Sequence, residues 1–194
     1  MPPAKPDTRD RLLAAGMLAI HTQGYAAAGV QEITAAAGVP KGSFYNHFPS
    51  KAAFGRAALD AYWKAAGPAL ALLAEPGRGA LERIDRHFRA AQVALRDHGH
   101  DRGCLLGNFA IEAPAAGPEI RGRVGEIFDA WTAALAACLR EGADVGEIRT
   151  DVSPEDLARL LLATWHGSVQ RAKVEPSAAA FDAFHRAIPR LLRP

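Results

Sequence analysis

A short segment near the N-terminus combines basic, aromatic and small polar side chains. From Val39 to Lys51 it runs Val-Pro-Lys-Gly-Ser-Phe-Tyr-Asn-His-Phe-Pro-Ser-Lys, and the prolines bound one short helix. Lysine ammonium groups bind phosphate oxygens, and amide and hydroxyl groups hydrogen-bond the edges of bases. The chemistry of this helix is therefore that of nucleic-acid recognition.

A second set of polar side chains lies near the middle of the chain. Cys104, Asn108 and Glu112 recur at every fourth position, so a helix beginning near Cys104 places a thiol, an amide and a carboxylate on one face. Polar groups that converge among aromatic side chains are typical of a small-ligand pocket. The predicted pocket residues are Tyr62, Trp63, Phe88, Cys104, Asn108, Phe109, Glu112, Trp131 and Trp165.

Two other kinds of chemistry fit less well. His98, His100, Asp101 and Cys104 are suitable zinc ligands, but their spacing matches no closed zinc site, and we expect no bound metal. The sequence contains no nucleophile motif, phosphate loop or nucleotide fingerprint. We therefore expect neither an enzyme nor a cofactor. The alternative for Cys104 is an inert thiol buried as a small apolar side chain.

The segments around the first motif form a helix-turn-helix. Apolar residues at Val30, Ile33 and Ala37 predict a helix that ends at Gly38, and a turn through Pro40 leads into the recognition helix. A helix from about residue 8 to residue 23 precedes this pair and stops at Gly24. Ser50 is a suitable N-cap for a further helix that extends to about residue 66.

Helical periodicity continues through the rest of the chain, and alternating strand patterns are absent. The further helices are expected at about residues 80–97, 104–112, 118–141, 153–173 and 177–192. The predicted fold is all-α with about nine helices. The three helices around the helix-turn-helix lie within residues 1–49, and residues 50–194 form a larger helical part.

Composition sets wider limits. The 194 residues are 49% hydrophobic, which is enough for a substantial core, and the net charge is only +2. Residues 1–67 contain seven Lys or Arg against four Asp or Glu, so only the N-terminal third is basic. No run of eighteen apolar residues and no secretory core occur, so we expect a cytoplasmic protein whose two cysteines are reduced.

The recognition segment carries two unfavourable features that a bound phosphate explains. Gly42 near a helix start costs up to about 1 kcal/mol relative to alanine, and close approach of a phosphate to the backbone justifies it. Lys41 and Lys51 each lie in a first helical turn, where the helix dipole disfavours a cation until a phosphate binds. Phe44 and Phe48, four residues apart, are expected to pack inward.

The spacing of these residues resembles the N-terminal domain of the TetR family of bacterial transcriptional repressors. The resemblance rests on Gly24-Tyr25, Val30, Ile33, Ala37-Gly38-Val39, Lys41-Gly42-Ser43, Tyr45, His47-Phe48 and Ser50-Lys51. It departs from the family at Ala28 and Gly29, where a Thr or Ser commonly caps the second helix. A second resemblance, to repressors that answer acrylate and electrophiles such as N-ethylmaleimide, rests on Arg102 to Asn108, Glu112, Trp131, Gly146-Glu147 and Arg171-Ala172-Lys173.

The resemblance implies that residues 1–49 form a helix-turn-helix DNA-binding domain and residues 50–194 a helical ligand-binding and dimerisation domain. It also implies a homodimer that binds a palindromic double-stranded operator and is released by a small-molecule inducer. By position, the residues facing DNA are Gln31, Lys41, Gly42, Ser43, Tyr45, Asn46, His47 and Lys51. The last two helices are the expected dimer interface, through Leu157, Leu160, Leu161, Thr164, Gly167, Ser168, Phe181, Phe184, Ile188 and Leu191. Burial of these stripes within one chain is the alternative. A TetR-like activator, or a regulator with an unrelated apolar ligand, also remains open.

Overall fold

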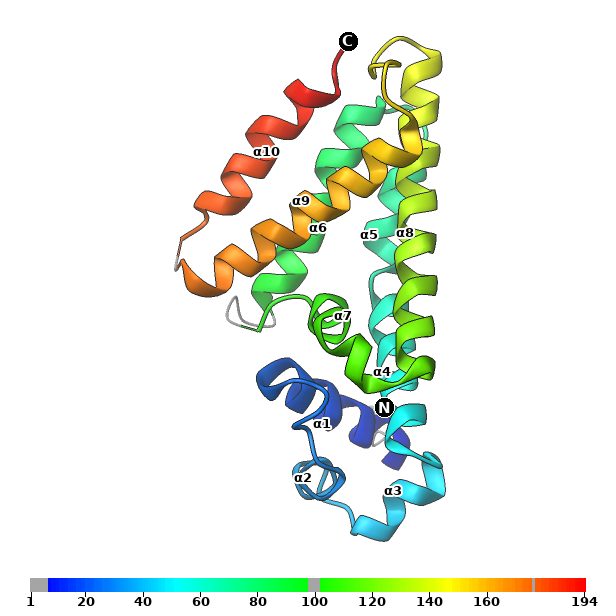
Figure 1. Cartoon of the computed structure of the whole chain (residues 1–194), viewed down its shortest axis with the longest axis vertical. Coiled ribbons are helices and arrows are strands. Elements are labelled where there is room, and N and C mark those ends of the chain that lie inside the picture. Colours follow the sequence, from blue (N-terminus) through cyan, green and yellow to red (C-terminus); the bar gives the residue numbers. More distant parts are fainter. Residues whose placement is uncertain (1–6, 98–101, 176) are drawn as a thin grey trace, which may run out of the picture. The chain divides into compact units, whose positions relative to one another are not determined.

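The computed structural model describes residues 7–97, 102–175 and 177–194 (Figure 1). These residues form ten α-helices and one 3₁₀ helix, and no strand occurs among them. The all-α prediction is confirmed. The additional elements are α5 (Gly67–Ala71) and the 3₁₀ helix η1 (Leu72–Ala74), in a stretch that the sequence analysis treated as punctuation. Pro68 lies in the first turn of α5, where its fixed φ and missing N–H are tolerated.

The N-terminal helices lie close to the predicted positions. They are α1 (Thr8–Gln23), α2 (Val30–Ala36), α3 (Lys41–His47) and α4 (Lys51–Ala65). Gly24 ends α1 with φ +89°, and Gly38 occupies the turn between α2 and α3 with φ +63°. A side chain is strained in this left-handed region, so both turns require glycine.

The later helices are α6 (Ala80–Asp97), α7 (Leu105–Ala116), α8 (Pro118–Asp144), α9 (Pro154–Val174) and α10 (Ala179–Leu192). Ser153 caps α9 by accepting a hydrogen bond from the N–H of Asp156 at 3.1 Å, as its sequence predicts. Three of the residues weighed as zinc ligands, His98, His100 and Asp101, lie outside the described residues.

The chain divides into two compact units, each built from two segments. Unit 1 comprises Met1–Trp63 and Leu105–Gly125, and unit 2 comprises Lys64–Cys104 and Glu126–Pro194. Unit 1 therefore contains the helix-turn-helix together with α7 and the start of α8. The functional division after residue 49 stays a prediction, because it concerns what the segments bind.

Three phenylalanines form the centre of unit 1. The ring centroids of Phe44, Phe48 and Phe54 are 5.0 to 5.5 Å apart, and all three side chains are buried. The prediction that Phe44 and Phe48 pack inward is confirmed. Gly16 of α1 lies directly against the Phe54 ring, which a Cβ at this position would overlap.

A second aromatic cluster joins α6, α9 and α10 in unit 2. Phe88 lies with its ring centroid 5.0 Å from Trp165 and 4.8 Å from Phe184, and Phe181 contacts Trp165 at 5.3 Å. Figure 1 shows α10 running beside α9. Phe181, Phe184 and Ile188 are buried within the single chain. For these three residues the alternative prediction, burial within one chain, is therefore confirmed.

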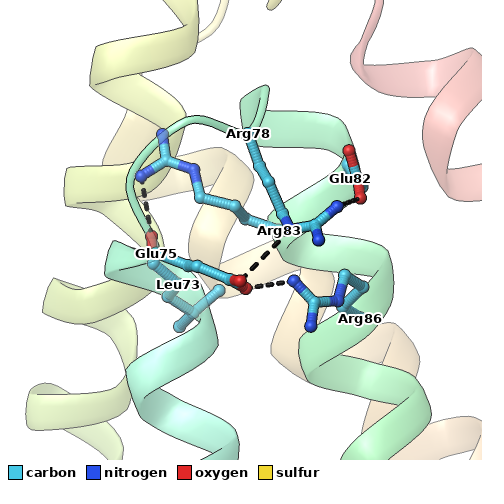
Figure 2. A network of polar contacts seen from close by, with 6 residues as sticks. All are labelled: Leu73, Glu75, Arg78, Glu82, Arg83 and Arg86. Carbon is cyan, nitrogen blue, oxygen red and sulfur yellow. Dashed lines mark hydrogen bonds and ion pairs between the residues drawn. The ribbon is translucent and has the colours of Figure 1, made fainter.

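Charged side chains fix the N-terminal end of α6. Glu147 accepts hydrogen bonds from the N–H groups of Ala80 and Leu81 at 2.6 and 3.2 Å. Nearby, the buried Arg83 donates to the carbonyl oxygen of Leu73 at 3.0 Å, while Glu75 pairs with Arg78 and Arg86 (Figure 2). The contacts of Glu147 and Arg83 satisfy backbone groups at helix ends, which have no partner within the helix.

The close approach of Gly16 to Phe54 gives a test of the unit 1 core. Gly16→Ala should lower the free energy of unfolding, because about 1–3 kcal/mol of overpacking exceeds the gain of about 1 kcal/mol in helix propensity. Gly122→Ala is the matched control: a Cβ there meets no atom of the described residues within 4 Å, so stability should rise. Urea unfolding measures both changes, and a shift of the same sign in the two variants would contradict this packing.

Candidate functional site

The outward face of α3 carries most of the side chains predicted to meet DNA. Lys41, Gly42, Tyr45 and Asn46 are exposed, with Tyr45 at 55% exposure. Ser43 and His47 are half-buried beside the inward phenylalanines, and Gln31 on α2 is exposed. The helix thus separates a polar outer face from an apolar inner one.

The starts of α2 and α3 lack side-chain caps. Gly29 precedes α2 and Pro40 precedes α3, and neither position provides a hydrogen bond from a side chain to the first turn. The missing cap at Ala28 and Gly29, expected from the sequence, is confirmed for α2. First-turn N–H groups that lack a side-chain acceptor can bind water or an anion such as phosphate.

Arg11 holds the turn of the helix-turn-helix in place. Its Nη2 donates to the carbonyl oxygen of Ala37 at 2.6 Å and to that of Gly38 at 3.1 Å. Sequence reasoning missed this residue, because its partners lie 26 and 27 positions away. Arg11 fixes the angle between α2 and α3 from the side of α1.

Lys51 is bound to the protein through its ammonium group. The Nζ donates to the carbonyl oxygen of Ala26 at 2.8 Å and lies 5.0 Å from the centroid of the Tyr25 ring. Burial lowers the pKa of Lys51, and the charge of Glu112 offsets part of that shift. Lys51 therefore has a structural function in unit 1 in addition to its predicted contact with phosphate.

Glu112 has a different environment from the predicted one. Its two carboxylate oxygens accept hydrogen bonds from the N–H groups of Tyr25 and Ala26, both at 2.7 Å. Gly24, which precedes Tyr25, also lies close to this carboxylate. A Cβ at position 24 would be 2.5 Å from Oε1 of Glu112. The carboxylate is committed to the turn between α1 and α2, and this corrects its placement among pocket groups.

Tyr25 completes this arrangement. Its ring is buried, with the centroid 5.1 Å from that of Phe109, and a Cβ on Gly55 would lie 2.7 Å from its Cε2. The pKa of Tyr25 is raised by burial and by the charges of Glu119 and Glu112. The turn after α1 is thus held by a carboxylate, a lysine and an aromatic ring.

Of the three residues predicted to share one helical face, Asn108 and Glu112 lie within a helix and Cys104 does not. α7 begins at Leu105, one residue after Cys104, and Cys104 belongs to unit 2 whereas the other two belong to unit 1. Since residue 104 precedes the helix, the four-residue spacing does not place it on the helical face. Asn108 is buried, as is Phe109.

The predicted aromatic pocket residues are divided between the units. Tyr62 and Trp63 are half-buried on α4, and Tyr62 has its ring centroid 6.1 Å from that of His21. In unit 2, Phe88 and Trp165 are core residues with at most 1% exposure. Their role as ligand contacts stays a prediction.

Trp131 makes a specific hydrogen bond in the core of unit 2. Its indole N–H donates to Nε2 of His87 at 2.9 Å, and the Nδ1 of His87 lies 2.8 Å from the carbonyl oxygen of Ala69. Since a carbonyl only accepts, His87 carries its proton on Nδ1 and is neutral. Burial lowers the pKa of His87, which agrees with this state.

Cys104 lies in a tight turn next to an imidazole. Its side chain is buried with 4% exposure, and Gly103 before it has φ +67°. The thiol interacts with His166 of α9, and the aliphatic end of Lys173 packs against Gly103. Sequence reasoning did not identify His166, because nothing in the local pattern joins positions 104 and 166.

A cleft of about 370 Å³ opens between α8 and α9 in unit 2. Its lining combines apolar, charged and hydroxyl side chains: Phe128, Asp129, Thr132, Arg159, Leu162, Ala163 and His166. None of the predicted pocket residues lines it. His166, whose imidazole interacts with Cys104, is one of the lining residues.

The second cysteine has a different environment. Cys138 is buried on α8 with its Sγ 3.8 Å from the carbonyl oxygen of Ala80, and burial raises the pKa of its thiol to about 11. Both cysteines are free thiols. Among the described residues there is no cluster of three potential metal ligands. Within that part of the chain no helix is long and apolar enough to cross a membrane.

Comparisons with known proteins match both parts of the chain. Residues 12–58 match the family described as bacterial regulatory proteins, tetR family, and residues 80–188 match the tetracyclin repressor-like C-terminal domain. The chain is 35% identical to the HTH-type transcriptional repressor DhaR of Mycobacterium sp. strain GP1, over 93% of this chain and 90% of the relative.

Two solved structures are similar along nearly the whole chain. The regulatory protein TetR from Rhodobacter sphaeroides has a TM-score of 0.88 and 33% identity, with 95% of this chain and 98% of that one covered. The reduced form of NemR from Escherichia coli has a TM-score of 0.83 and 27% identity, with 96% and 97% covered.

The hydrogen bonds of Glu112 give a prediction for the turn after α1. Glu112→Gln should lower the free energy of unfolding by roughly 1–3 kcal/mol, because an amide N–H₂ then faces a backbone N–H that has lost its carboxylate acceptor. Amide hydrogen exchange at Tyr25 and Ala26 should accelerate. Glu119→Gln, an exposed position in the same unit, should change stability by no more than about 0.5 kcal/mol. Unchanged exchange at both amides in Glu112→Gln would contradict the assignment.

Proposed function

The chain belongs to the TetR family of bacterial transcriptional regulators, and from that premise we propose that it is a ligand-responsive repressor. In this proposal a homodimer binds a palindromic operator and leaves it when a small electrophile reacts at Cys104. The family and its matched relatives are regulators and not enzymes, in agreement with the prediction from sequence. We place the protein in the cytoplasm, where operator DNA is accessible.

The observation that carries the DNA-binding proposal is the polar outer face of α3. A recognition helix enters the major groove with its first residues at the base edges. Asn46 and Ser43 have the hydrogen-bonding groups to contact bases, with Gln31 beside them on α2. Lys41 and Tyr45 are exposed and suited to phosphates.

The remaining DNA contacts follow from the ends of the short helices. Gly42 leaves the backbone at the start of α3 open, because a Cβ there meets no described atom within 4 Å. His47 and Lys51 lie at the end of α3 and the start of α4, where they can reach the flanking phosphates. Lys51 would bind phosphate while its ammonium stays anchored to Ala26.

A homodimer would place two recognition helices in successive major grooves. The exposed faces of α9 and α10 support an interface different in part from the predicted one. Leu160, 58% exposed, shares the face of α9 with Thr164 and Gly167. On α10, Ala183 and Ala187 are exposed in line with Leu191, which is 56% exposed. The small residues beside Leu160 on α9 and beside Leu191 on α10 would allow these two helices to pack closely against the same helices of a second copy, as a four-helix bundle.

The inducer proposal rests on the position of Cys104 in the chain. Cys104 is the last residue of a unit 2 segment, and Leu105 begins the segment that belongs to unit 1. An adduct at residue 104 would displace the start of α7, and α7 carries the Glu112 that fixes the turn after α1. α4 also continues from one unit into the other and is a second route. The inducer acts only through its differential affinity for the two conformations.

Operator binding separates phosphate contacts from base contacts. Lys41→Ala should weaken binding to every DNA sequence and reduce the slope of log K against log salt by about one unit, because one phosphate contact is lost. Asn46→Ala should cost about 1–3 kcal/mol at one base position and leave the slope unchanged. Fluorescence-anisotropy titrations at several salt concentrations measure both. Identical behaviour of the two variants would count against the assigned roles.

The cysteines provide the test of induction. Cys104→Ser should retain operator binding and lose its release by N-ethylmaleimide, whereas Cys138→Ser should respond as the wild type does. The difference is expected because a thiol with a pKa of about 11 is almost fully protonated at neutral pH. An electrophoretic mobility-shift assay measures the release of the operator. Release of Cys104→Ser at the wild-type concentration of reagent would rule out this thiol as the sensor.

A further inference from the structure

We propose that His166 is the general base for the Cys104 thiol, and that the pair adds to small α,β-unsaturated carbonyl compounds that enter through the cleft between α8 and α9. The inference deepens the proposed function by assigning the residue that activates the thiol and the route by which the electrophile enters. The role of the pair in induction rests on the proposed function. The reaction of the thiol with an electrophile can be measured without DNA.

The tautomer of His166 is set by its own helix. Nδ1 lies 2.8 Å from the carbonyl oxygen of Leu162, which only accepts, so Nδ1 carries the hydrogen. Nε2 therefore presents a lone pair. This atom is buried and accepts no hydrogen bond of ordinary geometry from the described residues, while the Cys104 thiol lies close enough to interact with the His166 ring. A thiol facing an imidazole whose other nitrogen is anchored is the arrangement of an activated nucleophile.

Aromatic neighbours hold the imidazole in this orientation. The His166 ring packs edge-to-face with Phe128 at a centroid distance of 5.3 Å and with Trp131 at 5.8 Å. Trp131 is itself fixed by its hydrogen bond to His87. The base is thus oriented by two rings and one backbone carbonyl, so little freedom is lost when it receives a proton.

The charge state of His166 agrees with this function. Burial lowers its pKa, but the nearby Cys104 thiol and the charge of its thiolate outweigh burial, and the pKa is raised above its ordinary value. A raised imidazole pKa beside a thiol favours the imidazolium–thiolate pair near neutral pH. The other charged groups around the pair are Lys173 against Gly103, and Asp129 and Arg159 in the cleft.

The cleft suits a small carbonyl compound. Phe128 and Leu162 offer apolar surface to a carbon skeleton, and Thr132 and Arg159 carry hydrogen-bond donors for a carbonyl oxygen. His166 is the lining residue that also contacts the thiol. A volume of about 370 Å³ accommodates a small molecule.

The addition is balanced without an oxidant or a second substrate. The thiol proton passes to Nε2 of His166, and Sγ of Cys104 forms a bond to the β-carbon of the electrophile. The electron pair of the carbon–carbon double bond moves toward the carbonyl oxygen to give an enolate. The imidazolium then returns the proton to the α-carbon, so the product is a thioether and His166 is neutral again.

The test measures alkylation of the full chain by N-ethylmaleimide between pH 5 and 9, in a Cys138→Ser background, with adduct formation at Cys104 followed by mass spectrometry. In His166→Gln, the rate at pH 7 should fall by roughly tenfold, and the profile should move toward the thiol's ordinary pKa of about 8.5. His185→Gln is the matched control and should keep the original profile. An unchanged rate and profile in His166→Gln would overturn the proposal.

A second measurement does not depend on the folding of the His166 variant. The pKa of His166, followed through its ring protons by NMR, should fall in Cys104→Ser, because the thiolate that stabilises the imidazolium is removed. An unchanged pKa would contradict the pairing.

The outcomes also separate this inference from the proposed function. If alkylation depends on His166 but the operator stays bound, the pair is correct and induction at Cys104 is wrong. If His166→Gln is alkylated at Cys104 and leaves the operator as readily as the wild type, induction at Cys104 is supported and the assignment of His166 as the base is wrong.

Discussion

Two backbone N–H groups with one carboxylate as their acceptor hold unit 1 together. The N–H groups of Tyr25 and Ala26 lie in the turn between α1 and α2, and both donate to Glu112, which is 87 and 86 residues further along the chain. Hydrogen bonds to an ionised carboxylate are shorter and stronger than neutral ones. The glycine at position 24 leaves room for the carboxylate, and the lysine at position 51 places a positive charge near it. The turn that leads into α2 is therefore fixed by its own glycine and by contacts from α4 and α7.

Local sequence signals predicted most of the helices but not the contacts that join them. Periodicity and capping residues such as Gly24, Gly38 and Ser153 act within a few positions, and the helix ends that they predict lie close to the observed ones. The partners of Arg11, Glu112 and His166 are far away in sequence, and no local pattern encodes such pairs. The same limit explains the stripe of Phe181 and Phe184: periodicity shows that a face is buried but not against what.

The two cysteines show how surroundings determine the chemistry of one side-chain type. Both are buried, and composition alone cannot distinguish them. Cys138 faces a backbone carbonyl oxygen, which gives a thiolate no stabilisation, so burial raises the pKa of the thiol. Cys104 lies beside an imidazole, which can receive the thiol proton and stabilise the charge that remains. The spacing of one helix grouped Cys104 with Asn108 and Glu112, whereas the informative neighbour of Cys104 comes from a different helix.

The composition of unit 1 has a consequence for how such regulators can be recombined. Unit 1 is built from Leu105–Gly125 as well as the first 63 residues, so the N-terminal DNA-binding segment is not an independent domain that can be excised. A fragment ending after α4 would keep Tyr25 and Phe54 but lose Phe109, Glu112 and Ile120, which pack against or cap that segment. Exchange of operator specificity between relatives must therefore transplant the middle segment as well, or graft only the outer residues of α3 onto an otherwise intact chain.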